Sequence, residues 1–227
     1  MTAGDPAPRA QDGLEAFAAL AAHQLGEAVA LMRGAASVLE NERVRIGPGG
    51  QDALRALNAG GERAQRYVDD LLDVVRASSA VEGPTSADLD SALDAAAAEL
   101  EPFLARERVQ LRREPLPRAA LDAREAQRLF THLLRSALAA GASRVLLAGG
   151  TGDDGVTVEM LDDGTPAADG SRPFEPFARP RGRGPLIGAG VSLPVCRRIV
   201  ERRGGTIAMA TREDGATLVT IRLASAG

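Results

Sequence analysis

The first third of the chain repeats apolar residues at an alternating three- and four-residue spacing, which is typical of helices that pack along a seam. Gly47-Pro48-Gly49-Gly50 separates the two repeating segments and predicts a break that no helix would contain. Residues 11–80 are therefore expected to form an antiparallel helical hairpin. One hairpin cannot bury such a seam alone, so we expect a homodimer in which two hairpins form a four-helix bundle. The seam positions are Leu14, Ala18, Ala21, Leu25, Ala28, Met32, Ala35 and Leu39, then Leu54, Leu57, Gly61, Ala64, Val68, Leu71 and Val75.

Residues 78–85 are small and polar, and Gly83-Pro84 interrupts them, so they predict a hinge before a second domain at residues 86–227. Ser86 is expected to cap a helix that runs to about Ala105. A second helix should run from Asp122 to Ala140, where Gly141 stops it. Alternating segments predict strands at 109–111, 144–148, 156–161, 206–210 and 217–223, with a turn over 149–155. The expected fold class is α plus α/β: a helical hairpin followed by an α/β sandwich with a mixed sheet.

Composition excludes several classes of protein. The 227 residues include 44% hydrophobic and 26% charged residues, as in a globular protein, and a net charge of -4 gives no general attraction to nucleic acid. No apolar run is long enough to cross a bilayer and the start does not read as a signal peptide. We therefore expect a cytoplasmic protein without membrane insertion. We also expect it to carry no sensor module of its own, which makes a separate sensor protein a candidate partner. The single Cys196 excludes a disulfide framework within the chain and is expected to be a buried thiol.

His23 is a candidate for chemistry because of its place on the first helix. With Ala21 and Leu25 on the seam, His23 falls on the opposite side, where another protein or domain can reach it. A solvent-exposed histidine without a task is the alternative. Gln24 follows it directly, and Glu27 lies one helical turn away.

The C-terminal half carries three short motifs in a fixed order. Asp162-Asp163-Gly164 closes a strand whose valines and methionine alternate toward a core, although the same triplet is common in hairpin turns. Phe174-Glu175-Pro176-Phe177 follows in a proline-rich loop. Gly188-Ala189-Gly190 then opens a helix whose exposed amides favour phosphate binding, with Ser192 as its expected cap.

In this order the motifs resemble the ATP-binding domain of the histidine kinases. Residues 17–27, together with residues 66–72, resemble the H-box helix and its partner helix in phytochrome-type members of that family. The resemblance implies that His23 is the phosphoacceptor. Gln24 would orient its ring, and Glu27 would hydrogen-bond to it or position a water molecule.

The resemblance also implies a site for ATP and magnesium. Asp162 would accept a hydrogen bond from the adenine amino group, Gly164 would let the backbone approach the ring, and Ser136 would reach the magnesium ion. The residues that the resemblance places around the nucleotide are His132, Ser136, Asp162, Gly164, Phe177, Gly188, Gly190 and Ser192.

Several residues depart from the family pattern, among them Ala28 in place of a proline, Pro166 in place of a glycine and His132 in place of an asparagine. Three further substitutions bear on the chemistry. Gln24 replaces an acid, Ser136 replaces the asparagine that reaches magnesium, and Ser192 replaces a third glycine. The family default is a protein-histidine kinase that moves phosphate from ATP to His23 and exchanges it with an aspartate of a response-regulator receiver domain. The substitutions leave open a histidine phosphotransferase or a pseudokinase adaptor with a degenerate nucleotide domain.

Overall fold

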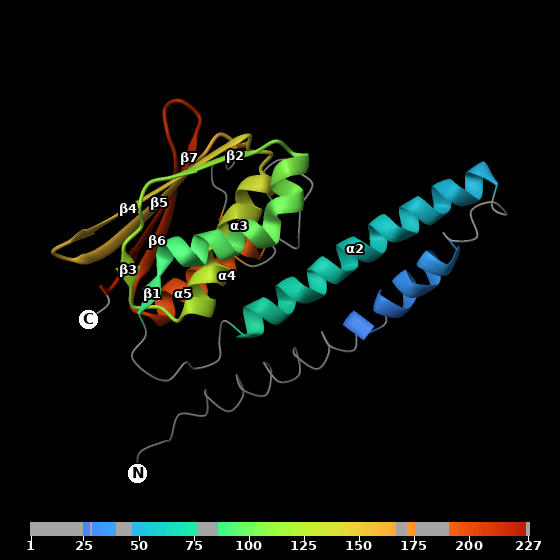
Figure 1. The fold of residues 1–227 in the computed structure, drawn as a ribbon, viewed down its shortest axis with the longest axis horizontal. Coiled ribbons are helices and arrows are strands. Elements are labelled where there is room, and N and C mark those ends of the chain that lie inside the picture. The colour runs from blue at the N-terminus through green and yellow to red at the C-terminus, as the bar shows by residue number, and fades with distance from the viewer. Residues whose placement is uncertain are drawn as a thin grey trace, which may run out of the picture. The chain divides into compact units, whose positions relative to one another are not determined.

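A computed structural model describes residues 25–27, 29–39, 47–76, 86–166, 172–175 and 191–225 (Figure 1). The chain divides into two compact units, residues 1–76 and 77–227. The expected hinge at residues 78–85 lies outside the described ranges. Within those ranges, none of the helices has the length and apolar character that crossing a membrane would require.

The first unit contains two antiparallel helices, as the seam predicts. Residues 25–27 and 29–39 are helical, and α2 spans Pro48–Arg76 (Figure 1). A Cβ placed on Gly26 would lie 3.5 Å from Val68 Cγ1, and one placed on Gly61 would lie 2.8 Å from Arg33 Cγ. The earlier residue of the first helix therefore meets the later residue of α2, which confirms the hairpin.

Only part of the predicted seam is buried within one hairpin. Leu54 and Val68 of α2, both predicted seam residues, are each 7% exposed. On the described part of the first helix the predicted seam is wrong for the hairpin's own contact, because the buried residues there are Val29 and Ala36, which the seam did not include. The other large apolar side chains in the described part of the first helix remain open to solvent. They are Leu25, Leu31, Met32, Val38 and Leu39.

The expected break at Gly47-Pro48-Gly49-Gly50 is wrong in its extent, because α2 begins at Pro48 and includes both following glycines. The carbonyl of Gly47 accepts hydrogen bonds from the amides of Gly50 and Gln51 at 2.9 and 3.0 Å and so starts the helix. Proline suits the first helical position, where its missing N–H has no partner to lose. Of the four residues of the expected break, only Gly47 lies outside α2.

The second unit is a two-layer sandwich. Its mixed sheet has the order β2-β4-β5-β7-β6, with β2 parallel to β4 and the other pairs antiparallel. Helices α3, α4 and α5 cover one face of this sheet (Figure 1). The strands are β2 (Gln110–Arg113), β4 (Arg144–Gly152), β5 (Gly155–Asp162), β6 (Thr206–Thr211) and β7 (Thr217–Leu223), and the helices are α3 (Leu89–Arg106), α4 (Ala123–Ala139) and α5 (Ser192–Arg202).

The core lies between this sheet and the helices. Helix α4 contributes the largest share of fully buried side chains, and alternate residues of β4, β5 and β7 meet them. The largest buried side chains include Phe130, Leu133, Leu134 and Leu138 of α4, and Leu147, Met160 and Ile221 of the sheet.

The sequence predicts the N-terminal cap of α4 correctly, but not that of α3. Helix α4 begins as expected at Asp122, whose carboxylate accepts from the amides of Arg124 and Glu125 in a capping box. The cap expected at Ser86 is wrong, because Asp88 caps α3 by accepting from the Ser91 amide at 3.0 Å. Residues Ala87–Asp88 instead form β1, a short strand paired with β3 (Arg118–Ala119).

Strands β4 and β5 are longer than expected. The turn expected over residues 149–155 contracts to Asp153 and Asp154, between the ends of the two strands. Gly149 belongs to β4, since a Cβ there would lie 3.0 Å from both Leu116 Cδ2 and Pro117 Cδ. A glycine in this segment thus marks close packing against a neighbouring loop rather than the turn itself.

Candidate nucleotide site in the second unit

Asp162 ends β5 on the helix-facing side of the sheet, as the sequence predicts. Val156, Val158 and Met160 share that side and are each 1–2% exposed. Asp162 itself is 1% exposed, and its Oδ1 accepts from the Gly164 amide at 3.0 Å. The strand alternation therefore brings a carboxylate into the same layer as α4.

Gly164 lies against the end of α4. A Cβ on Gly164 would lie 2.7 Å from the Cβ of Ala140 and 3.0 Å from Asp162 Oδ1, so the position has no room for a side chain. The next residue, Thr165, donates its amide to the Ala140 carbonyl at 2.8 Å. The segment after β5 is thus tied to the C-terminal end of α4 by one hydrogen bond and one close contact.

Helix α4 presents His132 and Ser136 one turn apart on one side of the helix. Both are buried, His132 to 1% and Ser136 to 8% relative exposure. An imidazole and a hydroxyl therefore lie inside the helical layer, upstream of the Ala140 contact that anchors the segment after Asp162.

The start of α5 also approaches this part of α4. Cys196 Sγ donates to the Leu129 carbonyl at 3.7 Å, and Arg203, just after α5, donates to Glu125 from the other end of the helix. The two helices are therefore antiparallel. Because α5 runs antiparallel to α4, its first turn, which contains Ser192, lies toward the turn of α4 that contains His132.

The expected cap at Ser192 is wrong. Ser192 is the first residue of α5, and Val191 occupies the cap position without any side-chain hydrogen bond. The Val191 carbonyl accepts from the Val195 amide at 2.9 Å, which leaves the earlier amides of the first turn without a side-chain cap. Pro194 stands in the first turn, as expected.

Two contacts between α4 and α5 fix this arrangement. Cys196 is fully buried, as expected, and burial raises the pKa of its thiol, so the residue is structural. Glu125 Oε2 accepts from Arg203 Nε at 2.9 Å and Nη2 at 2.6 Å, and the Glu125 side chain is 8% exposed. The sequence reasoning did not single out Glu125, although its spacing from Asp122 is that of a capping box.

Several site residues expected from the sequence lie outside the described residues. They are His23, Gln24, Phe177, Gly188 and Gly190. Glu27 is described as an exposed residue on the first helix. The roles assigned to these residues stay predictions.

Comparison with known families decides what this fold is. Residues 121–226 match the model of the histidine kinase-, DNA gyrase B- and HSP90-like ATPases. Over these residues the second unit is similar to this ATPase family. The resemblance to histidine kinases that the motifs indicate is thereby confirmed for the ATPase domain. No curated protein matched the sequence of the chain.

Solved histidine kinases share the fold. Full-length ShkA in complex with AMPPNP is 22% identical over 93% of this chain, with a TM-score of 0.68, and the chain spans 46% of the ShkA length. The histidine kinase AdeS of Acinetobacter baumannii is 16% identical over 90% of this chain and 98% of its own, with a TM-score of 0.62. The ATP-binding domain of PrrB from Mycobacterium tuberculosis is 20% identical over 64% of this chain and 100% of its own, with a TM-score of 0.51.

The residues of the ATPase domain fit a nucleotide better than they fit a metal ion. Similarity to an ATPase family indicates nucleotide binding, and the buried Asp162 carboxylate and the Gly164 backbone suit the flat edge of a base. Within the described ranges, no group of three or more His, Cys, Asp or Glu side chains could hold a metal. Ser136 would offer magnesium a single hydroxyl, which does not make a magnesium site from protein ligands.

Asp163, beside Asp162, has a structural role. Its carboxylate accepts from the amides of Ser143 and Arg144 and from the Ser143 hydroxyl, each at 2.8 Å, and from the Arg144 guanidinium at 3.0 Å. Partial burial raises the pKa of this carboxyl, but the hydrogen bonds outweigh burial and hold the pKa well below its usual range. Asp163 therefore ties the end of β5 to the start of β4.

This lowered pKa predicts a pH dependence of stability. A carboxyl whose pKa is lowered by folding contributes stability above its unfolded pKa of about 3.9, and that stability is lost as the pH falls toward the folded value. We expect Asp163→Asn to lower the melting temperature at pH 7 and to flatten its decline between pH 5 and pH 2. Circular dichroism melts across this range would measure both. Asp154→Asn, in the exposed β4–β5 turn, is the control, and an equal effect there would contradict the assignment.

Proposed function

We propose that this chain is a histidine-kinase-like signalling protein that carries a phosphoryl group on His23. ATP is the donor, and an aspartate of a response-regulator receiver domain is the exchange partner. The match of residues 121–226 to the ATPase family, with Asp162 buried at the end of β5, is the observation that carries the proposal. A separate sensor protein would supply the signal.

The reaction needs two transfers. In the first, the bond from the γ-phosphorus of ATP to its bridging oxygen breaks, a phosphorus–nitrogen bond to the His23 imidazole forms, and ADP leaves. In the second, a receiver aspartate oxygen attacks the phosphorus and the imidazole leaves. Gln24 would orient the His23 ring, and Glu27 would hydrogen-bond to it or position water.

The proposed homodimer is supported by exposed apolar side chains of the first unit. Leu25, Met32 and Leu39 recur every seven residues and are 49–55% exposed in one chain. Such a stripe beside the hairpin's own contact supports a second copy as its cover, which would complete a four-helix bundle.

A second candidate function is a histidine phosphotransferase or a pseudokinase adaptor. The observation that favours it is the buried Ser136 in place of the asparagine of the family pattern, because its hydroxyl is a poorer magnesium ligand. In this case His23 would receive phosphate from a receiver domain, or would not be phosphorylated at all.

Incubation of the pure protein with radiolabelled ATP and magnesium separates these functions. We expect label on His23, found by mass spectrometry under alkaline conditions, and none in His23→Gln. Label on His132, or label that survives in His23→Gln, would rule out His23 as the acceptor. Absence of label from ATP, with label from a phosphorylated receiver domain, would favour the phosphotransferase.

A further inference from the structure

The sheet of the ATPase domain has a second face, opposite its helices. Strand alternation directs Val145 and Leu147 of β4 toward the helical core, so Leu146 points to the other side. The strand register places Arg112 of β2, Leu146 of β4 and Leu161 of β5 in one row across this outer face. Two leucines thus stand side by side with an arginine at the end of the row.

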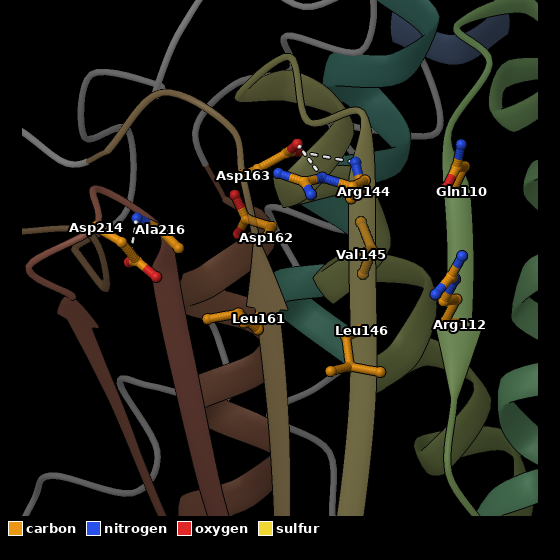
Figure 2. Close-up of a pocket in the computed structure, with 10 residues that line it drawn as sticks. All are labelled: Gln110, Arg112, Arg144, Val145, Leu146, Leu161, Asp162, Asp163, Asp214 and Ala216. Atoms are coloured by element: carbon orange, nitrogen blue, oxygen red, sulfur yellow. Dashed lines mark hydrogen bonds and ion pairs between the residues drawn. The ribbon is translucent and has the colours of Figure 1, made fainter.

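This row forms the floor of a hollow of about 490 Å³, here called the outer groove (Figure 2). Figure 2 shows Leu146 and Leu161 on neighbouring strands, with Arg112 on one side and Asp214 on the other. The residues that line the groove are Gln110, Arg112, Arg144, Val145, Leu146, Leu161, Asp162, Asp163, Asp214 and Ala216.

Leu146 distinguishes this face from the rest of the domain. It is 39% exposed, and in the described part of residues 86–225 no other large hydrophobic side chain is classed as exposed. The other leucines, isoleucines and valines that the structure describes in this domain are at least partly covered by its own packing. A leucine left open beside a second leucine therefore marks a place where apolar contact is available to another molecule.

The charges around the groove leave one arginine without an internal counter-ion. Arg144 pairs with Asp163 at 3.0 Å, and Asp214 pairs with Arg212 at 3.7 Å. Asp162 belongs to the helix-facing side and is buried. The side chain of Arg112 is exposed and makes no ion pair or hydrogen bond with any described residue. The groove lining holds three aspartates and two arginines, and Arg112 is the lining arginine that lies next to the apolar floor without a described counter-ion.

We propose that the outer groove is a docking site for a segment of a partner protein that carries an acidic residue beside an aliphatic one. The carboxylate would pair with Arg112, where a guanidinium offers a two-pronged hydrogen bond. The aliphatic side chain would cover Leu146 and Leu161. Arginine beside a partly desolvated apolar floor is a common arrangement in protein interfaces.

The floor of the groove is distinct from the candidate nucleotide site, although Asp162, at the end of β5, also lines the groove. The groove opens on the sheet face opposite α4 and α5, which carry His132, Ser136 and Ser192. The proposal therefore stands or falls independently of whether the chain uses ATP.

Selection from a phage library of random eight-residue peptides tests the proposal on the full chain. Wild-type protein should enrich peptides with Asp or Glu next to Leu, Ile or Val. Arg112→Glu should reverse the preferred charge to basic, because the groove then carries a carboxylate. No enrichment above blank resin, or enrichment that does not depend on residue 112, would overturn the proposal.

Calorimetry with an enriched peptide gives the quantitative test. Arg112→Gln should weaken binding about tenfold, since a charged hydrogen bond is lost, and Leu146→Ala should weaken it as well. Arg124→Gln, on the exposed first turn of α4, is the matched control and should leave affinity unchanged. Equal loss in the control would overturn the assignment. If the wild type self-associates and Leu146→Asp abolishes this association, the groove binds a second copy of the chain, which would also overturn the proposal.

Discussion

The Leu25→Asp variant is expected to be a monomer at concentrations where the wild type is a dimer. Leu25 is 55% exposed in one chain and lies on the same stripe as Met32 and Leu39. Two copies of the variant would lose two leucine contacts, about 2–4 kcal/mol together, and would bury two unpaired carboxylates. The dissociation constant should therefore rise at least about a hundredfold, which sedimentation velocity over a range of concentrations would measure.

Two further variants distinguish dissociation of the dimer from unfolding of the hairpin. Ser37→Asp adds the same charge at an exposed position on the opposite side of the first helix and should leave the dimer intact. Val68→Asp, by contrast, places a charge between the two helices of one hairpin, where Val68 is 7% exposed, and should reduce helicity. A wild type that sediments as a stable monomer at micromolar concentration would contradict the dimer.

Sequence periodicity predicted the layers of the fold better than their boundaries. The alternation in Val156, Val158 and Met160 specifies which side of β5 faces the helices, and it therefore also specified the burial of Asp162. Boundaries depend on side-chain hydrogen bonds that compete closely. Ser86 and Asp88 are both good helix caps, and the pairing of β1 with β3 decides between them in favour of Asp88.

Glycine and proline were the least reliable signals. Gly49 and Gly50 are exposed residues of the first turn of α2, where the Gly47 carbonyl accepts from the Gly50 amide, so their low helix propensity did not prevent the helix from starting there. Gly149 reads as a turn residue in the sequence, but it lies in a strand that a loop approaches closely. A glycine can be required either for backbone freedom or for space, and the sequence alone does not distinguish these two reasons.

Part of the candidate site could not be predicted, because it depends on contacts between residues that are far apart in the sequence. That Ser136 is buried follows from α4 packing on the sheet, and the closeness of Gly164 to Ala140 follows from the path of the chain after β5. Arg112 and Leu146 were missed as a pair because they lie on different strands. The signal was present in the alternation of residues 144–147, which turns Leu146 away from the core, but only the β2–β4 register brings Arg112 beside it.

Restoring the two substituted residues of the family pattern should raise autophosphorylation. Gln24 has no useful basicity, and Ser136 offers one short hydroxyl, so under the proposed function two separate parts of the transfer reaction would be weakened. A positioned acid–base group contributes roughly 10²–10⁴-fold to rate. We expect Gln24→Glu and Ser136→Asn each to increase the initial rate of label transfer from ATP, and the double variant to exceed either one.

The two changes lie in different units of the chain, so their effects on the logarithm of the rate should be nearly additive. Ser136 is 8% exposed, and asparagine there adds volume at a cost of about 1–3 kcal/mol, so circular dichroism must first confirm that the variant is folded. Ser136→Ala removes the hydroxyl without adding volume and should lower the rate if Ser136 binds the metal. His23→Gln in the double-variant background should abolish all label. If the wild type autophosphorylates rapidly and neither substitution raises its rate, other groups act as the acid–base group and the magnesium ligand. If no variant gains label, the exchange with receiver domains or the adaptor role becomes the better account of His23.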